Sequence, residues 1–234
     1  MSLPLSKIKN NLTVIILCGG KGSRLKPLII NTPKPLIKIK KKTILESIID
    51  HLLAYEFSNI ILASGFKGDQ FDNFINKNYK KYNIKNIKTP VNWDIVQRIN
   101  FCAEKFKSKY FIVCYGDTFA DINFDLMISK FKKKSNKVSM ACYEMKTNFG
   151  ILDIKKNFLV KNFREKPKLN IWFNIGYFLF DYKELKLFKK FSSFKKLITR
   201  LSKNNKLFAH KHFGKHITIN TLAELEKARK EINN

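Results

Sequence analysis

A short loop near the start of the chain carries residues that suit the binding of a phosphate group. Residues 18–24 read CGGKGSR and directly follow an apolar run, residues 12–17, that is rich in β-branched side chains. Such a run is typical of a strand that is buried on both faces. Glycines at its end allow successive backbone N–H groups to converge on an anion. Two cations, Arg24 and Lys34, lie near the loop in the sequence, and we therefore predict a nucleotide site there.

The spacing of the glycines separates this loop from two other phosphate loops. No Gly-Lys-Ser/Thr ends it, which excludes a Walker A loop, and its glycines follow G-G-x-G rather than the dinucleotide pattern. Pro27, Pro33 and Pro35 come next in place of a helix-forming run, and they favour an extended, rigid segment. The alternative is a glycine turn that merely caps a helix, which leaves both cations unexplained.

A carboxylate follows a second predicted buried strand. Asp117 comes after Gly116 at the end of residues 110–115, and ligands of open α/β sheets bind at the carboxyl ends of the strands. A carboxylate at this edge needs a partner, which a divalent cation bound to a triphosphate would supply. The alternative is that Asp117 caps a helix or belongs to a turn.

The elements that must position these residues alternate through the first half of the chain. Apolar runs predict strands, and amphipathic runs predict helices, the first of which starts with a capping box of Thr43 and Glu46. This rhythm indicates an α/β fold with a doubly wound, mostly parallel, Rossmann-like sheet. The predicted strands are residues 12–17, 59–64, 82–88 and 110–115, and the predicted helices are residues 43–55, 69–79, 94–106 and 125–133.

Closely spaced strands dominate the second half. They predict mixed or antiparallel strands that extend the sheet and form a lid over the site. No linker, repeat or low-complexity segment divides the chain, so we expect one domain over residues 1–234, with halves at about 12–135 and 136–234. The predicted strands are residues 137–144, 150–154, 159–164 and 172–180 with a short strand pair at 206–211 and 215–219, and the predicted helices are residues 183–190, 194–202 and 222–232.

The charge of the chain is strongly positive. Its 46 Lys and Arg against 18 Asp and Glu give a net charge of +28, which raises nucleic-acid binding as one interpretation. The excess is mostly lysine and is spread along the whole chain beside many Asn and Ile, which favours solvated faces over a nucleic-acid surface. A positive field would still attract polyanionic substrates such as nucleoside triphosphates.

The sequence gives little support for a membrane protein, a zinc protein or a disulfide-bonded protein. No apolar run approaches the length of a membrane span and no signal-peptide pattern opens the chain. The cysteines form no C-x-x-C pair, which argues against a zinc site or a disulfide framework, and we expect a cytoplasmic protein. His210, His212 and His216 favour surface strand positions over a metal site.

The whole pattern resembles the signature of the sugar-1-phosphate nucleotidylyltransferases. The motif G-G-x-G-[ST]-R-L-x-P followed by P-K-P-L is long and specific, and the resemblance extends over residues 12–230. It implies the nucleotidyltransferase, glycosyltransferase A-like architecture and a site for a nucleoside triphosphate and a sugar 1-phosphate. It implies catalytic roles for Arg24, Lys34 and Asp117, with Mg²⁺ held by Asp117. The nucleotide-binding positions are then Cys18, Gly19, Gly20, Gly22, Ser23, Gly65, Trp93 and Gly116.

Two further motifs of the family lie in the second half. Glu165-Lys166-Pro167 resembles its Glu-Lys-Pro motif, in which the glutamate bonds sugar hydroxyls and the lysine meets the sugar phosphate. Asn174 and Gly176 resemble its sugar-contacting Asn-x-Gly strand. The resemblance therefore assigns these four residues to the sugar phosphate and the second half of the chain to its binding.

The chain departs from the family at two positions. Most relatives have an aspartate as second metal ligand before the last helix, where this chain offers Thr218 or Asn220. Asn220-Thr221-Leu222 is most similar to the glucose-1-phosphate cytidylyltransferase branch, and the alternative is that Asn220 caps the helix. Relatives also carry glycines at the start of the third helix, where this chain has Trp93, which either stacks on a base or fills core space.

The implied reaction joins a nucleoside triphosphate to a sugar 1-phosphate and releases pyrophosphate, a step in nucleotide-sugar and polysaccharide biosynthesis. CTP is the first choice of nucleotide, followed by GTP, UTP and dTTP, and a homo-oligomer is possible. Three alternatives stay open: a cytidylyltransferase for a non-sugar phosphate such as phosphocholine, a relative that binds nucleotide sugars without turnover, and a nucleic-acid-binding protein.

Overall fold

Strands and helices alternate through the first half of the chain, as the sequence predicts. The computed structural model describes residues 5–22, 25, 30–133 and 138–231. The strands are β1 (Leu12–Cys18), β2 (Ile60–Ser64), β3 (Ile84–Lys88), β4 (Tyr110–Tyr115), β5 (Thr118–Ala120), β6 (Val138–Lys146), β7 (Ile151–Ile154), β8 (Val160–Arg164), β9 (Lys168–Asp181), β10 (Leu207–His212) and β11 (His216–Thr218). The helices are α1 (Leu5–Lys9), α2 (Ile44–Ala54), α3 (Asp69–Asn78), α4 (Ile95–Phe106), α5 (Phe124–Lys133), α6 (Tyr182–Leu185), α7 (Phe194–Lys203) and α8 (Leu222–Glu231), with the 3₁₀ turns η2 (Lys34–Leu36) and η3 (Lys186–Lys190).

Seven strands form the central sheet in the order β10-β6-β9-β4-β1-β2-β3. Strands β4, β1, β2 and β3 are parallel, with Val14 of β1 opposite Ile60 of β2 and Ile112 of β4. Strand β9 runs antiparallel to both β4 and β6, and β10 is parallel to β6. The mostly parallel α/β sheet extended by mixed strands is therefore confirmed.

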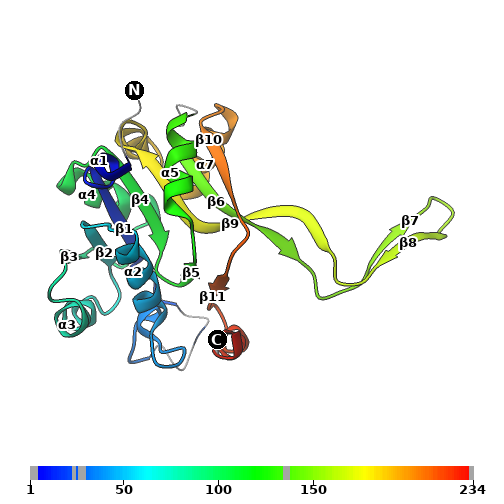
Figure 1. Ribbon diagram of the computed structural model, residues 1–234, viewed down its shortest axis with the longest axis horizontal. Coiled ribbons are helices and arrows are strands. Elements are labelled where there is room, and N and C mark those ends of the chain that lie inside the picture. The colour runs from blue at the N-terminus through cyan, green and yellow to red at the C-terminus, as the bar shows by residue number, and fades with distance from the viewer. Residues whose placement is uncertain (1–4, 23–24, 26–29, 134–137, 232–234) are drawn as a thin grey trace.

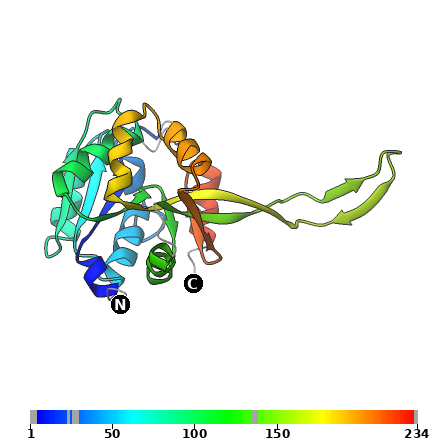
Figure 2. The same cartoon turned by 90° about the horizontal axis from the view of Figure 1, so that it is seen from above.

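Helices cover both faces of this sheet (Figures 1 and 2). Successive side chains of β1 point to opposite faces: Val14 and Ile16 pack in one core cluster with α2, α3 and α5, whereas Ile15 packs in the other with α4 and α7. Both faces being covered explains why the strand reads as an unbroken apolar run. Among the described residues, no helix combines the length and the apolar character that a membrane crossing requires.

Two helices that flank the sheet start with capping boxes. The side chain of Thr43 accepts from the backbone N–H of Glu46 at 3.1 Å, and the Glu46 carboxylate accepts from Thr43 at 2.6 Å, as the sequence predicts. Asp94 and Gln97 form a second capping box at the start of α4. Caps of this kind fix where a helix begins, and they hold the first turn of α4 beside the cavity described below.

The two short strands near the C-terminus do not pair with each other. Strand β10 joins the edge of the central sheet beside β6, and β11 pairs antiparallel with β5, with Thr218 opposite Thr118. The prediction of a strand pair is wrong here because each segment finds a partner far away in the sequence. The β5–β11 pairing brings the C-terminal segment next to the end of β4.

Strands β7 and β8 form a hairpin that lies outside the body of the protein. Strands β6 and β9 stay paired as far as Lys146 and Lys168, and the chain then continues into the two-stranded sheet β7–β8. Figures 1 and 2 show this hairpin projecting from the body in both views. We call residues 147–171 the arm. The predicted lid is wrong for this structure, because the strands extend away from the site instead of covering it.

Candidate active site

A cavity of about 420 Å³ opens at the carboxyl ends of β1 and β4, where ligands bind in open α/β sheets. The glycine loop forms one wall, the segment before α4 forms another, and residues from η2, the end of β4 and the C-terminal segment complete it. Eight of the predicted site residues line the cavity: Cys18, Gly19, Gly20, Gly22, Lys34, Trp93, Asp117 and Asn220. Arg98, Tyr115, Val91 and Pro35 lie among the other lining residues.

The guanidinium of Arg98 lies directly behind the glycine loop, and the sequence analysis did not identify it. A Cβ atom at Gly19 would lie 2.2 Å from Arg98 Nη1, so the loop approaches the guanidinium this closely only because residue 19 has no side chain. Arg98 is 4% exposed. Its sequence signal is a cation on the apolar face of a helix, beside Ile99 and Cys102.

The hydrogen bonds of Arg98 in the described part of the chain all run to neutral oxygens. Its guanidinium donates to Thr89 Oγ1, to Ser64 O at 3.3 Å, to Pro90 O at 2.9 Å and to Val91 O at 3.0 Å. Burial lowers the pKa of Arg98 from its usual value, and the charges of Cys102 and Asp94 partly oppose this shift. A buried cation bonded to neutral oxygens favours an anion nearby. Arg98 therefore gives the back of the loop a positive charge.

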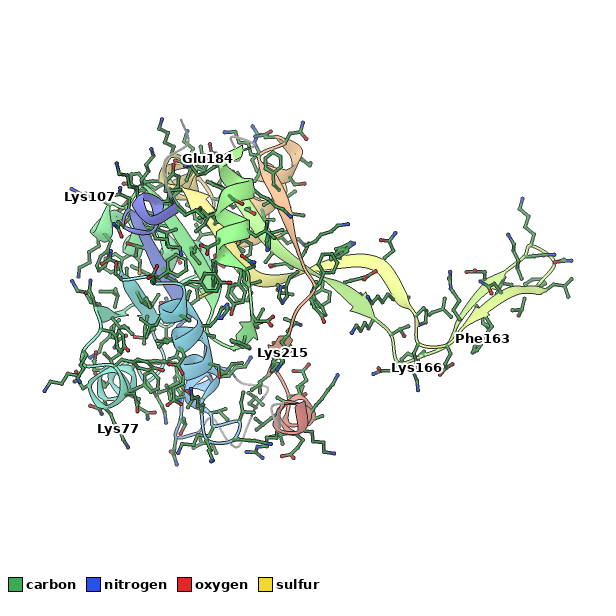
Figure 3. All side chains as sticks on the ribbon, viewed as in Figure 1. Lys77, Lys107, Phe163, Lys166, Glu184 and Lys215 are labelled. Carbon is green, nitrogen blue, oxygen red and sulfur yellow. The ribbon has the colours of Figure 1, made fainter. Side chains whose placement is uncertain are left out.

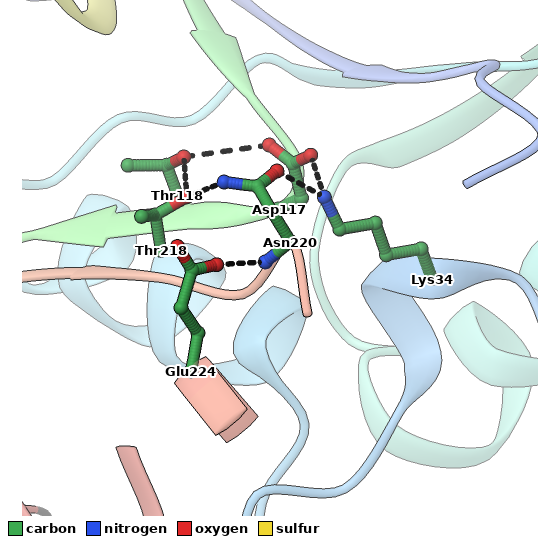
Figure 4. Close-up of polar contacts among 6 residues, drawn as sticks. All are labelled: Lys34, Asp117, Thr118, Thr218, Asn220 and Glu224. Carbon is green, nitrogen blue, oxygen red and sulfur yellow. Dashed lines mark hydrogen bonds and ion pairs between the residues drawn. The ribbon is translucent and has the colours of Figure 1, made fainter. Parts of the chain in front are cut away.

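Three polar side chains that line the cavity converge on one another (Figure 4). Lys34 Nζ donates to Asp117 Oδ2, and to Asn220 Oδ1 at 2.9 Å. The Lys34 side chain is 9% exposed and that of Asp117 is 31% exposed. The two oxygens come from segments about one hundred residues apart and meet at one ammonium. This arrangement is a small cation site in which the cation is the protein's own lysine.

Asn220 is held by its neighbours in an orientation that aims its oxygen at Lys34. Its Nδ2 donates to Thr218 Oγ1 at 3.2 Å, and its backbone N–H donates to the Glu224 carboxylate. The cap of α8 is Thr221, whose Oγ1 accepts from Glu224 N at 3.2 Å. The alternative that Asn220 caps the helix is therefore wrong, and Thr218 acts on the site by orienting the Asn220 amide.

The donors at this point fit a magnesium ion bound together with phosphates. Mg²⁺ prefers oxygen ligands, and proteins commonly supply one or two while water and substrate phosphates supply the rest. Asp117 offers a carboxylate oxygen and Asn220 an amide oxygen, and both face one cationic position. In the described part of the chain, no group of three His, Cys, Asp or Glu side chains forms a denser metal site.

Aromatic residues form the wall opposite the glycine loop. Trp93 is half-buried, lines the cavity and meets Phe101 edge to face at 5.5 Å. It therefore belongs to the cavity rather than to the closed core, in a position where a base could stack on it.

Asn174 and Gly176 support Tyr115: Gly176 has φ +80°, and a Cβ there would lie 2.4 Å from the Tyr115 ring. The Asn174 oxygen accepts from Gly176 N at 2.8 Å.

Three predicted nucleotide-binding residues have roles set by packing. A Cβ at Gly65 would lie 2.8 Å from Arg98 Nη1 and 2.9 Å from Gly19 O, and one at Gly116 would lie 2.8 Å from Cys18 Sγ. These two glycines lie behind the cavity wall and allow its segments to approach each other. Burial raises the pKa of the Cys18 thiol, and Cys114 and Asp117 add to the effect. A protonated, buried thiol is a poor nucleophile.

Two of the predicted sugar-phosphate residues lie away from the cavity. Glu165 and Lys166 are exposed on the arm, and Figure 3 places Lys166 and Phe163 outside the body of the protein. The cavity of this chain therefore lacks both members of the Glu-Lys-Pro motif. Ser23 and Arg24 lie outside the described residues.

The histidines near the C-terminus are not at the surface positions that the sequence favoured. His210 and His212 are 4% and 6% exposed, because β10 is part of the central sheet and its alternate side chains face a covered side. His212 Nε2 contacts Lys215 O at 2.9 Å and Asp121 Oδ1 at 3.1 Å. Burial lowers the pKa of His210 and of His216 to about 4. These residues support the edge of the sheet.

Comparisons with known proteins identify the family of the chain. The family model described as "Nucleotidyl transferase" matches residues 13–223. A protein of Bacillus subtilis described as "Probable glucose-1-phosphate cytidylyltransferase" is 26% identical over 94% of this chain and 95% of its own length. The D-glycero-alpha-D-manno-heptose 1-phosphate guanylyltransferase of Campylobacter jejuni is 30% identical over 65% of this chain and 67% of its own length.

A solved structure supports the fold. HddC from Yersinia pseudotuberculosis, in a complex with GMP-PN, superposes with a TM-score of 0.74 at 22% identity, covering 94% of this chain and 99% of that chain. Since the family model spans nearly the whole chain and the relatives are described as sugar-1-phosphate nucleotidyltransferases, the chain belongs to the nucleotidyl transferase family, among its sugar-1-phosphate nucleotidylyltransferases.

Proposed function

We propose that this protein joins a nucleoside triphosphate, with CTP as first choice, to a sugar 1-phosphate in a Mg²⁺-dependent reaction. The observation that carries the proposal is the convergence of Lys34, Asp117 and Asn220 in the lining of the cavity formed by the glycine loop. CTP is supported by the similarity to the Bacillus subtilis relative. The similarity to the Campylobacter jejuni guanylyltransferase makes GTP the next candidate.

The proposed reaction is an in-line displacement. An oxygen of the sugar phosphate attacks the α-phosphorus of the nucleoside triphosphate. The bond from this phosphorus to the oxygen that bridges it to the β-phosphorus breaks, and pyrophosphate leaves with that oxygen. The attacking phosphate is already an anion, so the step requires no nucleophile from the protein, and catalysis rests on positioning and on charge neutralisation.

Each part of the cavity has a task in this reaction. The N–H groups of the glycine loop, with the charge of Arg98 behind them, would hold the triphosphate. Lys34 would neutralise charge on the α-phosphoryl group, and Arg24 would bind the departing pyrophosphate. Asp117 and Asn220 would hold Mg²⁺, which when bound neutralises phosphate oxygens that both substrates bring. Trp93 would stack on the base.

The test measures pyrophosphate release with Mg²⁺ for the five common nucleoside triphosphates against a panel of sugar 1-phosphates. We expect release with one pair, and a loss of about two orders of magnitude or more in turnover for Lys34→Met and Asp117→Asn, as for other groups that stabilise transition-state charge. Lys77→Met is the matched control, because Lys77 is an exposed lysine of α3 that does not line the cavity.

The outcomes separate the proposal from its alternatives. Full activity of either site variant would contradict the proposed site. Release with phosphocholine and none with sugar phosphates would identify a cytidylyltransferase for another acceptor. If nucleotides raise the melting temperature but no acceptor gives pyrophosphate, the chain binds without turnover. Binding to arbitrary DNA that falls steeply with salt would indicate a nucleic-acid-binding protein.

A further inference from the structure

The arm carries an apolar face that nothing in the described chain covers. In the β7–β8 hairpin, Leu152 lies opposite Phe163 and Ile154 opposite Val160. Directly opposed residues of an antiparallel pair share a face, and Leu152 and Ile154 alternate onto the same one. The other face carries the ion pair of Arg164 and Asp153 at 3.1 Å, with Asn162 opposite Asp153 and Ile151 opposite Arg164. The hairpin is therefore amphipathic, as if its apolar side packed on another surface.

The exposure of this arm is unusual for an isolated chain. A two-stranded hairpin is marginally stable alone in water, and contiguous apolar surface of this kind indicates an interaction site. Each large side chain exposes on the order of 100 Å² and the arm has eight, so its exposed apolar surface totals up to about 800 Å², the size of one side of a stable interface if all eight take part. The eight exposed side chains are Phe149, Leu152, Ile154, Phe158, Leu159, Val160, Phe163 and Ile171.

The sugar-phosphate motif lies at this same face. A Cβ at Gly150 would lie 2.4 Å from the Phe163 ring and 3.2 Å from Glu165 Oε2, so both side chains lie over Gly150. Lys166 follows with φ +44° and contacts Glu165 Oε1 at 3.6 Å. A carboxylate and an ammonium thus lie beside an apolar surface, outside their own chain's cavity (Figure 3).

The rim of the cavity offers a matching surface. Val91 and Phe101 are 40% and 41% exposed, and Trp93 packs against Phe101. Val91 and Trp93 also line the cavity, so a segment that packs on this rim would lie at its entrance. Both views of the molecule show the tip of the arm well away from the body of its own chain (Figures 1 and 2).

We propose that the arm of one copy packs on the cavity rim of a second copy and delivers Glu165 and Lys166 to the sugar-phosphate side of that cavity. The exchange is reciprocal, as in a two-fold dimer, and each site is incomplete without the other chain. The inference rests on the proposed function, since it assigns the origin of two residues of that site. Because each copy carries a charge of +28, salt should strengthen the association by screening repulsion.

The association is tested first, without any substrate. Sedimentation of the purified protein should show a dimer, and Leu152→Asp should give a folded monomer with the wild-type secondary-structure content, because Leu152 is already exposed in the single chain. Leu126→Asp on α5 is the matched control, since the two leucines are 49% and 43% exposed. A wild-type protein that stays monomeric, or a Leu152→Asp variant that sediments as the wild type, would overturn the proposal.

The origin of the two residues is tested by complementation. Asp117→Asn disables the cavity and leaves the arm intact, whereas Lys166→Ala disables the arm and leaves the cavity intact. Heterodimers purified through two different tags should recover about half of the wild-type pyrophosphate release, because one of their two sites combines an intact cavity with an intact arm. Heterodimers as inactive as both parents would mean that each arm acts on its own chain.

The two experiments also separate this inference from the proposed function. If the wild type releases pyrophosphate with no pair of substrates, the proposed function fails, and sedimentation of Leu152→Asp against Leu126→Asp still decides whether the arm joins two copies. If the wild type is active but the heterodimers are not, the proposed function stands and the exchange of arms is refuted.

Discussion

Replacing Asn220 by aspartate should tighten the binding of Mg²⁺. Asn220→Asp keeps the shape of the side chain and the oxygen that faces Lys34, and it adds one negative charge beside Asp117. The hydrogen bond from Nδ2 to Thr218 Oγ1 is then made in the opposite sense, because the threonine hydroxyl can donate as well as accept. The fold around the site should therefore remain unchanged.

The size of the effect follows from the lysine that lies between the two oxygens. When Mg²⁺ replaces the Lys34 ammonium at this point, the charge facing residue 220 rises by one unit. A unit charge about 4 Å from another interacts by about 4 kcal/mol at an effective dielectric constant of about 20. Desolvation of the new carboxylate and its repulsion from Asp117 oppose this gain, and we expect a net gain of about 1–2 kcal/mol, or about 5- to 30-fold in affinity.

The assay is the Mg²⁺ concentration that gives half-maximal pyrophosphate release at saturating substrates. It should fall for Asn220→Asp and rise for Asn220→Ala, which removes the oxygen. Asn123→Asp is the matched control: it adds the same charge at the cap of α5, where aspartate caps as well as asparagine. If both Asn220 variants kept the wild-type Mg²⁺ dependence while remaining active, Asn220 would not be a metal ligand.

Two further predictions concern buried cations and imidazoles. Arg98→Met should lower the free energy of unfolding by about 2 kcal/mol and the melting temperature by about 4–8 °C. It should also weaken nucleotide binding about tenfold or more, and the nucleotide affinity of Arg98→Lys should lie between those of Arg98→Met and the wild type. If Arg98→Met bound the nucleotide as tightly as the wild type, the role given to the charge of Arg98 would be wrong. Burial lowers the pKa of His210 in the folded protein to about 4, below its value in the unfolded chain. The contribution of the neutral imidazole to the free energy of unfolding is therefore complete above about pH 6.5. It is lost as the pH falls toward 4, at up to about 1.4 kcal/mol per pH unit. Urea midpoints at neutral and mildly acid pH should therefore differ less in His210→Leu than in the wild type, and an equal difference would assign the acid sensitivity to other groups.

The sequence predicts the central sheet well because its buried strands are continuous apolar runs. Residues 12–17 and 110–115 are buried on both faces and read as unbroken apolar runs, and Thr43 with Glu46 marks a helix start that the structure confirms. The glycine loop and Asp117 follow such strands directly, so the edge of the sheet at which they meet could be inferred before any coordinates.

Other features depend on contacts that leave no local trace. Strands β5 and β11 are three residues each and find one another across about one hundred residues, so neither has a period long enough to predict. Arg98 shows in the sequence only as a cation on the apolar face of a helix, and it is the fold that brings it behind Gly19. The direction of the arm is set by where β6 and β9 continue past the sheet, which strand propensities do not encode.

The pairing of β5 with β11 is short, so the C-terminal segment that carries Asn220 can open locally while the rest of the protein stays folded. Three residue pairs attach this segment at its strand, and Asn220 lies two residues beyond them. Local opening of such small units costs far less than global unfolding. An opened segment would withdraw the amide oxygen while the glycine loop and Asp117 stayed in place. Amide protons of Ile217 and Ile219 should thus exchange faster than those of β1 in the free protein, and bound metal–nucleotide should slow them.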